Sequence, residues 1–479
     1  MSKNTSGITV KKSEDFSEWY TQAIIKSELA DYTDVSGCIV FRPASYQIWE
    51  KITKIVDEKF KKEGIQNCYF PLLIPEKLLS KEKEHVEGFS PEVAWVTEAG
   101  DSQLAERLAV RPTSETIMYP SFSKWIKSWK DLPLRLNQWN NVVRWEFKHP
   151  IPFLRTREFL WNEGHTVFAT KEEAEAERDT IIGIYEDVVE NYMALKGLIG
   201  KKSEKEKFAG AVYTVSMEYL LPNGKAIQGP DFHHDGQNFS KAFEINFLDK
   251  DEKKQYAYQN TFAITTRMLG VMLAIHGDDK GLVIPPKLAE NKVVIIPILF
   301  DDSKEKIIKV ANEIKKELKK FNPKLDDRDD YSPGWKYHEW ELKGIPIRLE
   351  LGPKDLEKNQ VVLVRRDNSE KKEIKIKDIS KEVESTLEKI QENLFIKSEK
   401  HLKSSLVEAK NWNDFKTALS NKKIVLAPFC NKKDCEEYIK DKTKGGKSLN
   451  IPFSQQKIKE PCIHCKKEAT VMCYFGKSY

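Results

Sequence analysis

The stretch Arg144-Trp145-Glu146-Phe147-Lys148-His149-Pro150, continued by Arg155-Thr156-Arg157-Glu158-Phe159, combines guanidinium groups, carboxylates and large aromatic rings on segments that alternate like adjoining strands. A further arginine, Arg267, follows Thr265-Thr266 far downstream. Guanidinium forks match phosphate oxygens, a carboxylate accepts from the adenine amino group, and an aromatic ring stacks on a base. The sequence shows neither a Walker loop nor a glycine-rich dinucleotide turn. These residues are therefore the candidates for binding a bent triphosphate.

An Arg-x-Glu pair on a strand is by itself a common surface ion pair. The run from 144 to 165, however, contains three arginines, three glutamates and two histidines. So many polar groups on adjoining strands are a poor choice for a core, because buried polar groups without partners are costly. We therefore interpret this run as part of a ligand site.

The bulk composition is that of a water-soluble globular protein. The chain has 479 residues, 40% hydrophobic and 32% charged, with a net charge of +5. No apolar run approaches the roughly 20 residues that cross a bilayer, and the first residues lack the hydrophobic stretch of a signal peptide. We expect a cytoplasmic protein with no membrane partner. The small net charge permits a local basic face.

Hydrophobic periodicity predicts two helices near the N-terminus, over residues 9–37 and 46–64. Residues 68–74 are predicted to form a strand. Pro71 restricts this strand to an edge or interface, because proline has no backbone N–H to donate to a neighbouring strand. Farther on, apolar strands alternate with polar loops at 109–111, 134–143, 165–169, 211–220 and 243–247, with a long helix over 171–195. The pattern predicts a mainly antiparallel sheet with one face available to a ligand.

A different pattern begins at residue 292. A strand (292–298), a helix (303–321), two strands (345–351 and 360–365) and a helix (379–395) follow one another, and a charged helix is expected over 398–410. Such alternation indicates an α/β domain. We expect an α+β domain with an antiparallel sheet (1–287), an α/β domain (288–397) and a small α/β C-terminal domain (398–479).

Five of the seven cysteines crowd the last fifty residues: Cys430, Cys435, Cys462, Cys465 and Cys473. In a reducing compartment this favours a metal over disulfides. Two spaced pairs, Cys430-x4-Cys435 and Cys462-x2-Cys465, offer four thiolates and no open position, which suits structural Zn²⁺. The alternatives are free buried cysteines or a regulatory dithiol. We expect Cys473 and His464 to lie outside the ligand set.

Several motifs resemble those of the prolyl-tRNA synthetases of archaeal and eukaryotic type, a family of class II aminoacyl-tRNA synthetases. The likeness is carried by Arg111-Pro112-Thr113-Ser114-Glu115, the stretch 144–150, Phe159-Leu160-Trp161-Asn162-Glu163-Gly164-His165, His276-Gly277-Asp278-Asp279-Lys280-Gly281-Leu282 and Gly352-Pro353-Lys354-Asp355. It extends over nearly the whole chain. It implies a class II catalytic domain that activates L-proline with ATP and transfers it to tRNA(Pro). It also implies a homodimer whose interface includes the segment around Pro71.

The resemblance implies roles for individual residues. The ATP contacts would be Arg144, Glu146, Arg155, Thr156, Phe159, Gln228, Asp231, Thr265 and Arg267, of which Arg144 and Arg267 would be catalytic. The proline contacts would be Thr113, Glu115, Arg144, Trp161, Glu163, His165 and His233. Mg²⁺ would bridge phosphate oxygens near Gln228. Because charge spreads over phosphate oxygens in this reaction, fixed cations rather than a protein nucleophile would promote it.

The two later domains also resemble parts of this family. The domain from 288 to 397 is similar to an anticodon-binding domain, in which Glu341, Arg348, Lys354 and Asp355 match positions that read guanines. Basic and acidic side chains can read unstacked bases on their polar edges. The alternative is a solvated charged surface. The C-terminal part resembles a zinc-binding domain, and RNA rather than DNA is the expected nucleic acid.

The sequence departs from the family in one loop. Ala-Thr-Ser is common there, whereas this chain has Pro230-Asp231-Phe232 before His233. Asp231 could pair with the substrate nitrogen or repel phosphate, and both readings stay open. The interval from 165 to 265 leaves no room for an editing domain of bacterial type. The competing hypotheses are another class II synthetase, such as one for threonine or serine, and a non-catalytic relative that binds tRNA or senses amino acids.

Overall fold

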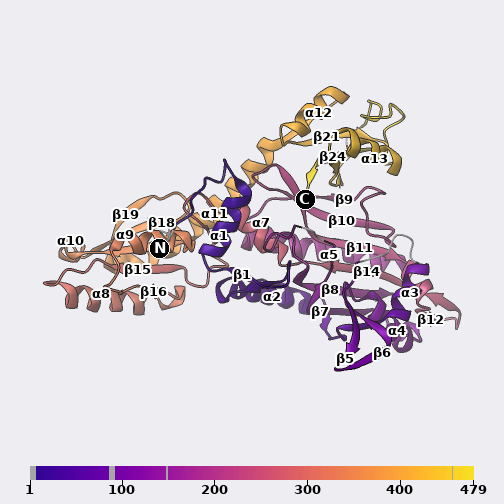
Figure 1. Cartoon of the computed structure of the whole chain (residues 1–479), viewed down its shortest axis with the longest axis horizontal. Helices are drawn as coiled ribbons and strands as arrows, with labels where there is room; N and C mark the ends of the chain where they lie inside the picture. Colours follow the sequence, from indigo (N-terminus) through magenta and orange to yellow (C-terminus); the bar gives the residue numbers. More distant parts are fainter. Residues whose placement is uncertain (1–6, 86–91, 147–148, 456) are drawn as a thin grey trace.

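The computed structural model describes residues 7–85, 92–146, 149–455 and 457–479. The predicted motif residues Phe147 and Lys148, and the start of the chain, lie outside these ranges. Figure 1 shows a large strand-rich region at one end, an α/β region at the other, and the C-terminal segments above the large sheet. The helix α11 (Ile379–Ser405) connects the α/β region to the C-terminal segments.

The large sheet is built around a run of antiparallel strands. In spatial order these are β7 (Leu134–Val143), β8 (Glu158–Phe168), β14 (Tyr258–Ala263), β11 (Lys225–Gly236) and β10 (Tyr213–Leu220). At the ends, β3 (Gln66–Asn67) pairs in parallel with β7, and β9 (Leu198–Lys201) pairs with β10. The predicted antiparallel catalytic sheet is confirmed.

Helices bury one face of this sheet. Helix α2 (Pro43–Lys62) begins with proline at its first turn and buries Ile48, Ile52, Val56 and Phe60 on one side, which confirms the predicted amphipathic helix. Helix α5 (Lys171–Asp187) starts with a capping box. Helix α7 (Arg267–His276) is apolar nearly all round and joins the same core.

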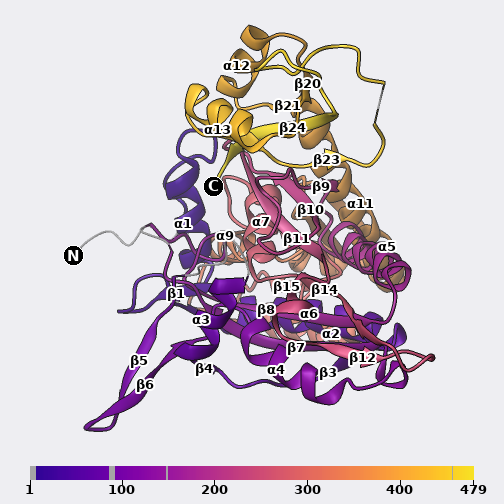
Figure 2. The same ribbon diagram turned by 90° about the vertical axis from the view of Figure 1, so that its right-hand side faces the viewer.

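Several smaller elements lie at the edges of the catalytic region. Strands β4 (Leu73–Pro75), β6 (Ser102–Val110) and β5 (Trp95–Ala99) form a separate three-stranded sheet. Its β5–β6 hairpin projects away from the body in Figure 2. The others are α3 (Glu76–His85), α4 (Glu115–Trp125), α6 (Asn238–Ala242), β12 (Asn246–Leu248) and β13 (Lys254–Tyr256).

Three predicted elements near the N-terminal half need correction. The helix expected over 9–37 is wrong beyond α1 (Phe16–Lys26), because Glu28 adopts a positive φ and the chain continues as β1 (Ala30–Tyr32) and β2 (Ile39–Phe41). The strand expected over 68–74 shrinks to β4, which starts only after Pro71. The strand expected over 243–247 begins only at Asn246, because Phe243 caps the C-terminal end of α6.

The long helices also differ from expectation. The helix predicted over 171–195 ends as α-helix at Asp187 and continues as a π-helical turn, Val188–Tyr192. The separate helices expected over 379–395 and 398–410 are one continuous helix, α11, whose apolar stripe runs through the expected boundary at residue 397. The domain limits themselves stay a prediction.

The α/β region contains a five-stranded sheet in the order β16 (Lys324–Leu325), β15 (Val293–Pro297), β17 (Ile347–Leu351), β18 (Gln360–Arg365) and β19 (Lys371–Lys375). Strands β16, β15 and β17 are parallel, and β18 and β19 continue antiparallel. Helices α8 (Lys304–Glu317), α9 (Pro333–Leu342) and α10 (Pro353–Glu357) connect them. The predicted α/β domain is confirmed.

The C-terminal region extends the large sheet. It contains β20 (Leu406–Glu408), α12 (Trp412–Ser420), β21 (Ile424–Phe429), α13 (Lys433–Lys442), β22 (Gly446–Ser448), β23 (Ile451–Pro452) and β24 (Val471–Ser478). Strand β24 pairs in parallel with β11, with Lys477 opposite Lys225. The C-terminal and catalytic strands therefore share one sheet, which the sequence did not indicate. Among the described helices, none is long and apolar enough to span a bilayer.

Candidate active site

A cavity of about 280 Å³ opens on the large sheet. It is lined by side chains from β8, β11 and β14, from the start of α4, and from the segment that leads into α7. The predicted ligand residues that line it are Thr113, Glu115, Arg144, Thr156, Phe159, Trp161, Glu163, His165, Gln228, Asp231, His233, Thr265 and Arg267. Residues far apart in the sequence thus meet in one place.

Two predicted ATP contacts do not line this cavity. Glu146 is exposed beyond the end of β7. Arg155 lies in a tight turn in which its backbone N–H donates to the carbonyl of Ile151 at 2.9 Å, and its charge is close enough to Arg267 to affect the pKa of that group. Their roles stay predictions.

Two arginines, Arg144 and Arg267, line the cavity close to each other. The Nε of Arg144 donates to the Pro112 carbonyl at 2.9 Å, and its guanidinium lies 5.5 Å from the Phe159 ring. Arg267, the first residue of α7, donates from Nη1 to the Gln228 carbonyl at 3.1 Å. Burial, followed by the positive charge of Arg144, lowers the pKa of Arg267. Both arginines are half-buried, and two cations that repel each other favour a bound anion.

Two buried carboxyl groups also line the cavity. The Thr113 hydroxyl donates to Glu115 Oε2, at the start of α4. Glu163 on β8 accepts at Oε2 from Gln138 Nε2 at 2.7 Å and from Asn140 Nδ2 at 3.3 Å. Its Oε1 is buried without a hydrogen-bond partner among the described residues. Burial, and then the charge of Glu115, raises the pKa of Glu163 to about 7. These two carboxyl groups suit a cationic nitrogen.

The histidines of the cavity are kept neutral. Burial lowers the pKa of His165 to about 4, and its Nδ1 lies 3.2 Å from the Tyr119 hydroxyl. Burial also lowers the pKa of His233, whose Nδ1 lies 2.8 Å from Thr214 Oγ1. Both rings therefore shape the pocket as uncharged groups at neutral pH.

Sequence reasoning missed part of the wall. Phe208 packs its ring against His233 at a centroid distance of 4.6 Å, and Thr214 approaches the same histidine from β10. Both residues line the cavity. The alternation of β10 could have placed Thr214 on one face, but no local pattern singled out Phe208, which lies in an irregular loop.

In the α/β region, the structure brings most of the predicted base-reading residues together. Arg348 on β17 donates from Nη1 to Glu341 at 3.0 Å and from Nε to Glu350 at 3.0 Å. Its guanidinium lies 4.3 Å from the Tyr337 ring. Asp355 caps the start of α10 and is close enough to help raise the pKa of Tyr337, after burial and Glu350. The predicted Lys354 is exposed on the same helix.

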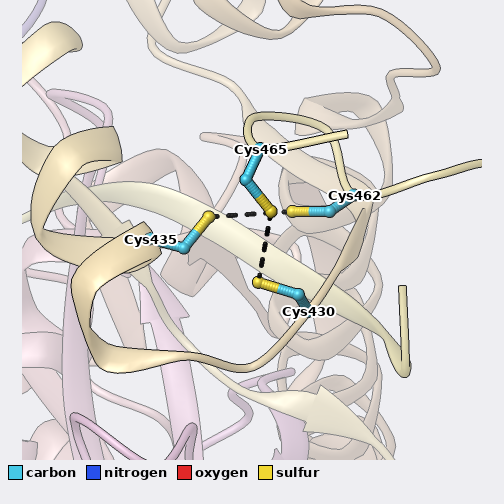
Figure 3. Close-up of side chains that lie close together, drawn as sticks. All are labelled: Cys430, Cys435, Cys462 and Cys465. Carbon is cyan, nitrogen blue, oxygen red and sulfur yellow. Dashed lines mark hydrogen bonds between the residues drawn. The ribbon is translucent and has the colours of Figure 1, made fainter. Parts of the chain in front are cut away.

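Four cysteines converge in the C-terminal region. The Sγ atoms of Cys430, Cys435, Cys462 and Cys465 lie within 4.8 Å of one another, as Figure 3 shows. Cys435 and Cys462 are 3.7 Å apart, as are Cys465 and Cys430. The Cys435 thiol, together with nearby backbone N–H groups, lowers the pKa of Cys462.

The donor set fits Zn²⁺, because four thiolates leave no open position. Cys473 is outside the cluster: its thiol donates to the Asn450 carbonyl at 3.5 Å. His464 lies 3.2 Å from Cys435 Sγ through Nδ1 and stacks on Tyr438 at 4.0 Å. His464 therefore contacts one of the four thiol ligands, Cys435, without belonging to the ligand set itself.

Sequence profiles of three families match successive parts of the chain. Residues 95–276 match the tRNA synthetase class II core domain (G, H, P, S and T). Residues 292–386 match the anticodon binding domain, and residues 412–479 match the C-terminal part of prolyl-tRNA synthetase. Together they account for all three regions.

Whole-length relatives agree with these matches. Proline--tRNA ligase 2 of Bacillus cereus is 47% identical and covers 100% of both chains. The Arabidopsis thaliana protein named cytoplasmic proline--tRNA ligase is 47% identical over 99% of this chain and 91% of its own. The crystal structure of prolyl-tRNA synthetase from Cryptosporidium parvum with halofuginone and AMPPNP superimposes with a TM-score of 0.95, at 47% identity, covering 99% and 100% of the two chains. The chain therefore belongs to the prolyl-tRNA synthetase family.

Proposed function

We propose that the chain is a proline--tRNA ligase. It activates L-proline with ATP to prolyl-adenylate and pyrophosphate, then transfers proline to the 3′-terminal adenosine of tRNA(Pro). The observation that carries this proposal is that a single cavity is lined by two arginines, Arg144 and Arg267, and by two buried carboxyl groups, Glu115 and Glu163. Arginines suit a triphosphate, and carboxyl groups suit the cationic nitrogen of an amino acid.

The proposed activation step needs positioning more than acid–base chemistry. The proline carboxylate attacks the α-phosphorus and pyrophosphate leaves, so negative charge shifts among phosphate oxygens. The guanidinium of Arg144 lies 5.5 Å from the Phe159 ring and 5.4 Å from the Trp161 ring, and we expect it to contact both the carboxylate and the phosphate. Arg267 is held by the backbone of Leu154 and Gln228, so its donors need little reorganisation.

We propose the following contacts with the two small substrates. The ATP contacts are Arg144, Glu146, Arg155, Thr156, Phe159, Gln228, Asp231, Thr265 and Arg267. The proline contacts are Thr113, Glu115, Arg144, Trp161, Glu163, His165 and His233. Mg²⁺ is expected to neutralise phosphate oxygens near Gln228, because it keeps several waters and needs few protein ligands.

A structural Zn²⁺ is proposed for Cys430, Cys435, Cys462 and Cys465. The convergence of the four sulfur atoms supports it. The ion would tie the loop before α13 to the loop before β24 and would hold the edge of the extended sheet together. It would take no part in the reaction.

Recognition of the tRNA anticodon is assigned to Glu341, Arg348, Lys354 and Asp355. Arg348 pairs with Glu341 through Nη1 and with Glu350 through Nε and Nη2, so its guanidinium is held in one orientation. Lys354 and Asp355 start α10 nearby. Guanine offers O6 and N7 to cations and its N–H groups to carboxylates.

A homodimer is proposed from the exposed apolar side chains around β4. Tyr69, Leu72, Leu73 and Trp95 are between 37% and 70% exposed in the single chain. Contiguous exposed apolar surface of this kind marks an interaction site. Light scattering of the wild type and of Leu73→Asp tests this: the wild type should have twice the mass of the variant.

The protein is expected to act in the cytoplasm, as the name of the Arabidopsis thaliana relative states for that protein. We expect neither a membrane nor DNA as a partner.

Amino-acid-dependent exchange of pyrophosphate into ATP, measured across the twenty amino acids, tests the proposed activity. Exchange should be strongest with proline. Exchange with another amino acid would reassign the substrate. No exchange from folded, metal-loaded protein that still binds tRNA would favour the non-catalytic hypothesis.

A further inference from the structure

The loop that follows helix α7 lies at the contact between the catalytic region and the α/β region. Helix α7 begins at Arg267, in the cavity wall, and ends at His276. The next described residues, 277–282, belong to one of the motifs that resemble the family, and none of them lines the cavity. Leu282 donates from its backbone N–H to the carbonyl of Leu342, at the end of α9, at 3.0 Å. A role for this motif is therefore expected where the two regions meet.

One buried arginine of the α/β region binds this loop. Arg366, which directly follows strand β18, donates from Nη1 and Nη2 to the two carboxylate oxygens of Asp278, at 2.7 and 2.6 Å. The Arg366 side chain is only 3% exposed. A guanidinium fork that binds both oxygens of a carboxylate fixes the orientation of the two groups as well as their distance. The pair therefore holds the loop after α7 against the α/β region.

The third donor of the same arginine holds a proposed anticodon-reading residue. Arg366 Nε donates to the backbone carbonyl of Glu341, in the last turn of α9, at 2.8 Å. The Glu341 carboxylate accepts from Arg348 Nη1 at 3.0 Å, and Nζ of Lys280 in the loop lies 3.7 Å from the same oxygen. The loop after α7 thus reaches Glu341 in two ways, through Arg366 and through Lys280.

Reading a base by hydrogen bonds depends on where the reading groups are held. A binding group has to stay within about 0.5 Å of its productive position. Arg366 fixes the backbone of the turn that carries Glu341. The activation step has no such need, because Arg267 is held by the carbonyls of Leu154 and Gln228, which lie outside the loop. The pair should therefore affect the use of tRNA and leave the activation of proline unchanged.

We propose that Arg366 and Asp278 are positioning residues for anticodon recognition, which hold Glu341 and its partner Arg348 in place from the loop after α7. This inference rests on the proposed function, and it assigns a role to a motif that lies outside the cavity. Hydrogen bonds to charged groups are strong, so loss of the pair should raise the KM for tRNA(Pro) by roughly 10- to 100-fold.

The first experiment compares wild type and Arg366→Met in two assays. Aminoacylation at varied tRNA(Pro) concentration should show the raised KM, whereas proline-dependent pyrophosphate exchange without tRNA should stay within about twofold of wild type. Arg365→Met is the matched control, because Arg365 makes a comparable two-bond pair with Asp367 inside the α/β region, at 3.0 and 2.8 Å. The control should leave both assays unchanged, and thermal denaturation checks that each variant is folded.

The second experiment separates positioning from a general structural effect. Replacing an anticodon guanine with adenine should weaken charging by wild type and should add little to the loss in Arg366→Met, because the two changes remove the same contact. A minihelix with the acceptor stem alone should be charged equally by both proteins. Asp278→Asn keeps the shape of the loop and should show the same pattern to a smaller degree, which provides a test if Arg366→Met does not fold.

The inference is overturned if the KM for tRNA(Pro) in both variants stays within about twofold of wild type. Equal losses in exchange or in minihelix charging also overturn it, because they would assign the pair to folding of the catalytic region. The same result follows if the adenine replacement costs Arg366→Met as much as it costs wild type. Failure of the proposed function is distinct, since wild type itself would then lack proline-dependent exchange or charge both tRNAs equally.

Discussion

Replacing Glu163 with glutamine should remove a pH dependence of proline binding. Glu163 is 2% exposed, and burial together with the charge of Glu115 raises its pKa to about 7. Below pH 7 the carboxyl is mostly neutral, and above it the anion can attract the cationic nitrogen of proline. The nearby His165, whose pKa is lowered to about 4, stays neutral over this range, and burial also lowers the pKa of His233.

The size of the effect follows from the ionised fraction. With a pKa of about 7, roughly one tenth of Glu163 is ionised at pH 6 and roughly nine tenths at pH 8. If the anion is the binding form, the KM for proline should fall about tenfold between these pH values. Glu163→Gln should show a high KM with no such slope.

Ionisation of Glu163 is expected to favour proline binding but to lower the free energy of unfolding. The folded-state pKa is raised from 4.5 to about 7, so the folded protein binds the proton more tightly than the unfolded chain. The resulting stabilisation is complete below pH 4.5 and is lost as the pH rises to about 7. The shift corresponds to about 3 kcal/mol of unfolding free energy. Relative to wild type, Glu163→Gln should therefore gain about this amount between pH 4.5 and pH 8.

Pyrophosphate exchange at varied proline concentration from pH 6 to 8, together with thermal denaturation over a wider pH range, measures both effects. Glu50→Gln on the exposed face of α2 is a matched control. Asp235→Asn is a second comparison, because burial raises the pKa of that carboxyl as well, followed by the charge of Glu115. An equal slope of KM with pH in wild type and Glu163→Gln would refute the reasoning.

Three further predictions concern stability and metal binding. Lys202→Met should cost about 3–5 kcal/mol, because it strands Glu218 in the interior, 2.5 Å from the lost ammonium. The double change Lys202→Met/Glu218→Met should recover most of that loss in thermal denaturation; an equally unstable double variant contradicts this. Gly164→Ala should cost about 1–3 kcal/mol, since a Cβ there would stand 1.9 Å from the Phe262 ring, and an unchanged midpoint of denaturation would disprove the clash. Cys462→Ser should lower the bound zinc measured by elemental analysis and increase amide exchange in the C-terminal strands, whereas full zinc retention would exclude this ligand.

Local sequence patterns were sufficient to predict those helices and strands whose apolar residues recur at regular intervals. The amphipathic stripe of α2 and the bounds of β7 and β18 follow from periodicity, since each buries one face or both faces of a regular element. Breaks inside apolar segments were missed. A positive φ at Glu28 ends the first helix, although no residue there is a usual helix terminator.

The candidate site could be assembled from sequence only with the help of motifs. Thr113, Glu163 and Arg267 meet although long stretches of chain separate them, and the family likeness brought them together before the structure did. Phe208 has no motif and enters the wall only through packing on His233. The side-chain directions of Glu146 and Arg155 depend on the turns around them, and the structure places neither in the cavity wall.

The sequence by itself determined the residue chemistry: arginines for phosphate, acids for a cationic nitrogen, and two spaced cysteine pairs for a metal. Only the tertiary structure decided the electrostatic state of these groups, because burial and neighbouring charges set the pKa of Glu163, His165 and Arg267. It also decided that β24 pairs with β11 and places the C-terminal region on the catalytic sheet. Strand pairing across more than two hundred residues depends on backbone hydrogen bonds, which are common to all sequences and leave no local pattern.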